Sequence, residues 1–142
     1  MVRDYLLNEK DYFKIMKNMF CIKKFKTHGI NKLLYISKNE LRDLKKIGHI
    51  IGLHSHNHPI RISQLSYDEQ LKEYKKNLLV LSKLLGMNTK NIKFMPHPYG
   101  DYNQNTLKIL KQLNIIMGFC RNLEKKSKSN LEIARINHAN FL

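Results

Sequence analysis

The strongest constraint on the fold is a long amphipathic helix pattern in the middle of the chain, bounded by a start signal and a stop signal. Ser66-Tyr67-Asp68-Glu69 is a capping box, in which the serine hydroxyl and the glutamate carboxylate satisfy backbone N–H groups in the first turn of a helix. Gly86 is the stop signal, and between the two signals one face carries Leu71, Tyr74, Leu78, Leu81 and Leu85. The pattern predicts a helix that buries this face in a core.

Short apolar runs on either side of this helix predict strands. They are residues 49–54, 92–95, 115–119 and 131–136, and a second helix is predicted over 104–113 with Asn103 as its N-cap. Strands that alternate with helices at this spacing are typical of crossover units and a largely parallel sheet, so the sequence predicts an α/β fold. In such sheets, functional groups gather on the loops that follow the carboxyl ends of the strands.

The N-terminal part of the chain has weaker signals. Residues 11–20 have a spacing compatible with an amphipathic helix, and residues 33–36 predict a strand or an extended segment. Ser37-Lys38-Asn39-Glu40 is another capping box, and it precedes a short helix that ends at Gly48. The buried stripe expected for this helix is Leu41, Leu44 and Ile47.

The composition is that of a globular chain with a large positive charge. Hydrophobic residues are 42% and charged residues 26% of 142 residues, which suits a single domain over 1–142 with residues 1–34 as a poorly defined N-terminal segment. The formal net charge is 26 − 11 = +15. Because 21 of the 26 basic residues are lysines spread along the chain, this charge favours a solvated basic surface over a nucleic-acid site.

Membrane association and export are also disfavoured. No apolar run approaches the roughly 18–20 residues that span a bilayer, and the chain does not begin like a secretory signal. We therefore expect a cytoplasmic protein with no membrane contact, for which nucleic acid is an unlikely partner. The two cysteines, Cys21 and Cys120, could form one disulfide at most, and we expect them to be buried thiols.

Three histidines at alternate positions follow the predicted strand 49–54, in the segment His54-Ser55-His56-Asn57-His58. In an extended segment all three would share one face, whereas a turn would let His54 and His58 converge. Either arrangement can present imidazoles to one zinc ion or another late divalent metal. The alternative is a polar turn whose rings bind backbone or water; the triplet at a strand end favours the metal.

A second polar cluster, Pro96-His97-Pro98-Tyr99-Gly100-Asp101, follows the predicted strand 92–95. The prolines restrict the backbone around His97, and Gly100 permits conformations closed to other residues. A rigid loop of this kind can hold a backbone N–H toward an oxyanion. The same residues are also common in an ordinary turn between a strand and a helix.

The two clusters together resemble the polysaccharide deacetylase family, also called the NodB homology domain or carbohydrate esterase family 4. The resemblance lies in His-Ser-x-x-His at His54 to His58 and Pro-Tyr-Gly at Pro98 to Gly100, each after a predicted strand, and extends from about residue 35 to the C-terminus. It is supported by Leu65-Ser66, by Thr106-Leu107 and by residues 113–119. It implies a partial (β/α) barrel of the NodB type that lacks the first strand.

The resemblance also implies roles for individual residues. His54 and His58 correspond to metal ligands, and Ser55 to a residue that steadies the loop between them. Tyr99 corresponds to the donor that offers its backbone N–H to the oxyanion, and His138 is the only late candidate for the catalytic general acid. The residues implied to line the substrate-binding groove are Ser55, His97, Pro98, Tyr99, Gly100 and Asp101.

The sequence departs from the family pattern before the histidines. No segment like Thr-Phe-Asp-Asp-Gly, which supplies a metal ligand and the catalytic base in the family, precedes His54; the aspartates found there are Asp4, Asp11 and Asp43. Pro96 stands where the family has an arginine. A third metal ligand could come from His56, His97 or Asp101.

The resemblance implies a hydrolase of the N-deacetylase type, acting on the acetamido group of N-acetylated amino sugars, with zinc or another divalent metal as cofactor. The missing aspartate pair predicts impaired turnover. The alternative is a non-catalytic remnant that binds glycan, or a subunit completed by a partner fragment. Open strand edges also predict an oligomer or a partner that covers them, and basic nucleic-acid binding is the least favoured function.

Overall fold

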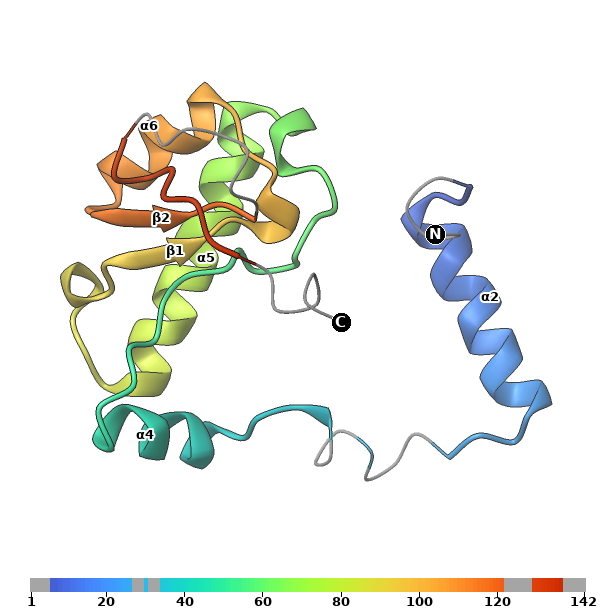
Figure 1. Cartoon of the computed structure of the whole chain (residues 1–142). Coiled ribbons are helices and arrows are strands. Elements are labelled where there is room, and N and C mark those ends of the chain that lie inside the picture. The colour runs from blue at the N-terminus through green and yellow to red at the C-terminus, as the bar shows by residue number, and fades with distance from the viewer. Residues whose placement is uncertain (1–5, 27–29, 31–33, 122–128, 137–142) are drawn as a thin grey trace. The chain divides into compact units, whose positions relative to one another are not determined.

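The computed structural model describes residues 6–26, 30, 34–121 and 129–136 (Figure 1). The chain divides into two units, Met1–Leu41 and Arg42–Leu142. The described part contains four α-helices and a two-stranded parallel sheet, which confirms the mixed α/β class. None of the described helices is both long enough and apolar enough to cross a membrane.

The first unit contains helix α2, Glu9–Ile22. It confirms the helix predicted over 11–20, and it begins where the Asn8 side chain accepts a hydrogen bond of 2.9 Å from the Asp11 N–H. The strand or extended segment predicted over 33–36 is wrong at Leu34, whose N–H donates to Ile30 O at 3.0 Å in a helical turn, whereas Tyr35 and Ile36 are not helical. Leu33 lies outside the described residues.

Helix α4, Lys38–Lys46, follows the predicted capping box, with Ser37 N–H bonded to the Glu40 carboxylate at 2.7 Å. The predicted stripe is only half-buried at Leu41 and Leu44. The prediction is wrong at Ile47, which follows the last helical residue and is 74% exposed.

Helix α4 contacts the end of helix α5, Tyr67–Leu85, through polar groups. Arg42 Nε donates to Leu84 O at 2.7 Å, and Lys45 Nζ donates to Leu85 O at 3.3 Å. These basic side chains satisfy carbonyl groups that the last turn of α5 leaves without helical partners.

Helix α5 confirms the central prediction from the sequence. Both halves of the capping box form at Ser66 and Glu69, and Gly86 ends the helix in the left-handed conformation with φ 59°. Helix α6, Gln104–Gln112, begins at a similar box formed by Asn103 and Thr106. The two helices contact each other.

The sheet is shorter than the apolar runs suggested. Strands β1, Phe94–Pro96, and β2, Met117–Phe119, are parallel and pair Met95 with Gly118. Residues 49–54 form no strand but join β1 through one bond, Leu53 N–H to Phe94 O at 2.8 Å. On the other side, Ile133 forms an isolated parallel bridge with Phe119.

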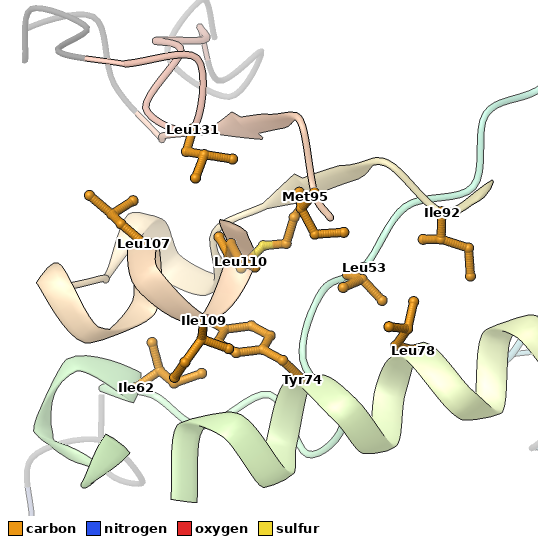
Figure 2. Close-up of a cluster of buried hydrophobic side chains, with 11 residues drawn as sticks. Leu53, Ile62, Tyr74, Leu78, Ile92, Met95, Leu107, Ile109, Leu110 and Leu131 are labelled. Atoms are coloured by element: carbon orange, nitrogen blue, oxygen red, sulfur yellow. The ribbon is translucent and has the colours of Figure 1, made fainter. Parts of the chain in front are cut away.

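The buried core lies between this sheet and helices α5 and α6 (Figure 2). Tyr74 and Leu78 of α5 confirm the predicted apolar face, and both are buried against residues of α6 and β1. The remaining buried members are Leu53, Ile62, Ile92, Met95, Leu107, Ile109, Leu110, Ile115 and Leu131. The core therefore fixes the carboxyl ends of residues 49–54 and of β1 relative to α5.

Both cysteines are free thiols. Cys120 is buried, as predicted, whereas Cys21 is exposed on α2 and corrects that prediction.

Candidate functional site

The segment from His54 to His58 forms a tight turn. Ser55 and His58 have positive φ angles of 63° and 52°, which are uncommon for residues other than glycine. The Ser55 hydroxyl accepts a hydrogen bond of 3.1 Å from the His58 N–H. This local bond closes the turn and brings the imidazole of His58 back toward that of His54.

The two imidazoles meet at their Nε2 atoms, which are 3.1 Å apart. His54 Nδ1 lies 2.8 Å from Pro96 O, and since a carbonyl only accepts, this nitrogen carries the proton and Nε2 keeps its lone pair. Two nitrogen ligands of one tetrahedral zinc ion, each at about 2.0–2.1 Å, lie roughly 3.3 Å apart. The pair therefore fits two positions around one divalent cation.

The candidates for a third ligand do not join this pair. Within the described ranges, no group of three or more His, Cys, Asp or Glu side chains is placed to hold a metal ion. His97 Nε2 bonds instead to Leu131 O at 2.8 Å. Both carboxylate oxygens of Asp101 accept hydrogen bonds of 2.8 Å from Ser63. His56 is half-buried in the turn itself. Among the described residues, His54 and His58 are thus the pair placed so that it could hold a metal ion.

The loop after β1 places Tyr99 beside the histidine pair. Tyr99 has φ 54° within the turn Pro98–Gly100, and its ring lies 4.9 Å from that of His58, edge to face. Gly100 has φ 72°, and a Cβ atom there would come within 2.7 Å of the Arg121 Cβ. Only glycine fits this position without displacing Arg121.

Asp101 fixes the far end of this loop. Besides the two bonds from Ser63 to its carboxylate, Asn103 Nδ2 donates to Ser63 O at 2.7 Å. The loop and the segment before α5 are therefore joined by charged and neutral hydrogen bonds.

His97 supports the loop from inside the fold. It is 1% exposed and stacks on Tyr102, with ring centroids 4.4 Å apart. Burial lowers the pKa of His97, and burial raises the pKa of Tyr102, whose hydroxyl donates to Glu132 at 3.0 Å. The side chains of His97 and Pro98 are both buried, whereas Tyr99 is partly open to solvent. The binding roles predicted for these residues stay predictions.

Two side chains of α5 bind the histidine turn and were not predicted from the sequence. The Glu73 carboxylate accepts from the backbone of His56 and Asn57, and the Asn77 side chain accepts from the His54 N–H. Their spacing of four residues places both on one helix face. Both side chains are half-buried beside the buried face of α5, and this polar pair at a spacing of four residues was the available signal.

Other predicted residues lie elsewhere or outside the described part. His138 and Asp4 are outside the described residues. Asp11 bonds to Asn8 at the start of α2, and Asp43 pairs with Lys46 at 3.0 Å on α4.

Comparison with known proteins gives the family. The family described as polysaccharide deacetylase matches residues 11–118. The chain belongs to the polysaccharide deacetylase family. This confirms the resemblance drawn from His-Ser-x-x-His and Pro-Tyr-Gly. Among curated proteins, none has significant sequence similarity to the chain.

Solved structures of other proteins share the fold. The deacetylase PplD of Streptococcus pyogenes, in complex with acetate, is 28% identical, with a TM-score of 0.64 over 76% of this chain and 48% of its own. The BpsB deacetylase domain of Bordetella bronchiseptica is 14% identical, with a TM-score of 0.59 over 73% of this chain and 52% of its own. IcaB of Ammonifex degensii is 18% identical, with a TM-score of 0.58 over 70% and 46%. This deacetylase family member therefore spans about half the length of the structures it matches.

Proposed function

We propose that this chain forms the histidine-bearing part of a metal-dependent N-deacetylase that hydrolyses the acetamido group of N-acetylated amino sugars in a glycan. The observation that carries the proposal is the 3.1 Å separation of the His54 and His58 Nε2 atoms. Family membership supplies the expected substrate class and a divalent metal.

The proposed architecture is part of a (β/α) barrel that lacks the first strand. Residues 51–53, β1, β2 and residues 131–133 follow one another across the sheet through backbone hydrogen bonds. The histidine turn follows the first of these segments and the Tyr99 loop follows the second. Because residues 51–53 lie beside β1, the ends of these two segments bring the two motifs together, as in other sites at the carboxyl ends of strands.

In the proposed site, His54 and His58 hold zinc or another divalent metal, which supplies a Lewis acid for the acetyl carbonyl. Pro96 O fixes the tautomer of His54, and Ser55 fixes the backbone at His58. Tyr99 lies against His58 and is the proposed backbone donor to the oxyanion. A hydrogen bond to developing charge stabilises the transition state more than the ground state.

The general base has to come from another segment. In the family pattern an aspartate pair before the histidines supplies the base and the third ligand, and this sequence has no such pair before His54. A two-histidine site binds metal less tightly than the usual three ligands. We therefore expect turnover only when a segment bearing the aspartate pair is added.

The test is acetate release from an oligomer of N-acetylglucosamine in the presence of Zn²⁺. The chain is mixed with a polypeptide that carries the first strand and the aspartate pair of a family member. We expect release from the mixture, none from either part alone, and loss of release in His54→Ala. The matched control is His49→Ala, an exposed histidine outside the pair, which should leave release unchanged.

Two results would count against catalysis by this site. If the mixture made with His54→Ala still releases acetate, the hydrolysis does not depend on the histidine pair. No release from the mixture, together with retention of the oligomer by the chain, would support a glycan-binding domain without turnover.

A further inference from the structure

The histidine turn is attached to α5 by a set of hydrogen bonds that converges on two side chains. The Glu73 Oε2 atom accepts from His56 N–H at 3.1 Å and from Asn57 N–H at 2.8 Å. The Glu73 Oε1 atom accepts from Asn57 Nδ2 at 2.6 Å. One helical turn further, Asn77 Oδ1 accepts from His54 N–H at 3.0 Å.

These bonds act on the backbone that joins the two imidazoles. The turn holds two residues, Ser55 and His58, in the left-handed region, which is strained for residues other than glycine and persists only where the surroundings enforce it. Asn77 holds the start of the turn and Glu73 holds its middle. At the end of the turn, the Ser55 hydroxyl accepts from the His58 N–H.

A carboxylate is the group that these donors require. Three N–H groups from two successive residues point at Glu73, and an ionised carboxylate accepts at both oxygens, whereas an amide accepts at one and donates at the other. Hydrogen bonds to a charged acceptor are also roughly twice as strong as neutral ones.

We propose that Glu73, assisted by Asn77, is the positioning residue that holds the His54 and His58 imidazoles at one point. The hydrogen bonds of Glu73 and Asn77 reach the backbone of the turn and the Asn57 side chain, and their effect on the imidazoles passes through that backbone. This inference rests on the proposed function, because the point where the imidazoles meet is the proposed metal position.

The experiment compares Glu73→Gln with Asp68→Asn, which removes the same charge from an exposed site on the same helix. The first readout is the Zn²⁺ affinity of the full chain by calorimetry, expected to fall about 10–100-fold in Glu73→Gln, as for other residues that orient metal ligands. The second readout needs no metal: the nuclear Overhauser effect between the His54 and His58 ring protons. We expect it in the unmodified chain and in Asp68→Asn, and not in Glu73→Gln.

A swapped pair separates positioning from general stability. Asn57→Asp alone places a second carboxylate against Glu73 Oε1 and should weaken both readouts. Combined with Glu73→Gln, it makes the carboxylate and the amide exchange places. The amide at position 73 then donates to the carboxylate at position 57 and accepts from the backbone N–H groups of residues 56 and 57. Both readouts should recover in the double variant.

The outcomes distinguish this inference from the proposed function. A persistent ring-to-ring effect in Glu73→Gln, or no recovery in the double variant, would overturn the positioning role. If the chain takes up no Zn²⁺, the proposed metal site fails, and the ring-to-ring effect still decides the role of Glu73.

Discussion

At the scale of single residues, the loop that carries Tyr99 is supported by a buried imidazole. His97 is 1% exposed, and its Nδ1 atom has no hydrogen-bond partner among the described residues. Burial therefore lowers its pKa. The folded state holds His97 neutral, while the unfolded chain protonates it below about pH 6.5.

This difference predicts an acid-sensitive fold. The stabilising contribution of His97 is fully present above about pH 6.5 and declines as the pH falls from there toward its lower folded-state pKa. When the pH is lowered from 7.5 to 5.5, the free energy of unfolding measured with urea should fall less in His97→Gln than in the unmodified chain. His49→Gln, at an exposed position, should behave like the unmodified chain; an unchanged loss in His97→Gln would contradict this account.

The spacing of His54 and His58 could be recognised from the sequence, but the path of the turn could not. The sequence left an extended segment and a turn equally open. The structure forms a turn because Ser55 and His58 adopt positive φ angles, which residue type alone does not favour. The bonds from Glu73 and Asn77 come from residues 16 to 23 positions away, so no local pattern contains them.

At the scale of elements, helices were predicted better than strands. The capping boxes at Ser66 and Ser37 mark real helix starts because their bonds are local. Strands depend on neighbours: residues 49–54 have one bond to β1, and after it the chain turns at Ser55. Leu34 belongs to an apolar run that predicts a strand or an extended segment, but it lies in a helical turn, because an apolar run alone does not distinguish the two.

Close backbone contact within the sheet gives a prediction at this scale. A Cβ atom at Gly118 would overlap Leu131 O, so the sheet admits only glycine there. Gly118→Ala should lower the unfolding free energy by about 1–3 kcal/mol, as overpacking does elsewhere. Gly86→Asn is the control, since its Cβ meets no atom within 4 Å and asparagine tolerates its left-handed backbone. Urea unfolding measures both, and equal losses would contradict the overlap.

At the scale of the whole molecule, the chain spans about half the length of the solved structures it matches and carries a formal net charge of +15. The family could be recognised from two short motifs because each is local in the sequence and follows an apolar run. The third metal ligand could not be chosen from sequence. Two candidates close to the motifs in sequence form other hydrogen bonds: His97 Nε2 bonds to Leu131 O, and the Asp101 carboxylate accepts from Ser63.

The central claim is that the imidazoles of His54 and His58 bind one cation together, and X-ray absorption of the zinc-loaded chain tests it most directly. We expect two imidazole nitrogens at about 2.0–2.1 Å from zinc in the unmodified chain and in His49→Ala. We expect one in His58→Ala, with a weaker affinity. An unchanged number of imidazole ligands in both His54→Ala and His58→Ala would contradict the claim.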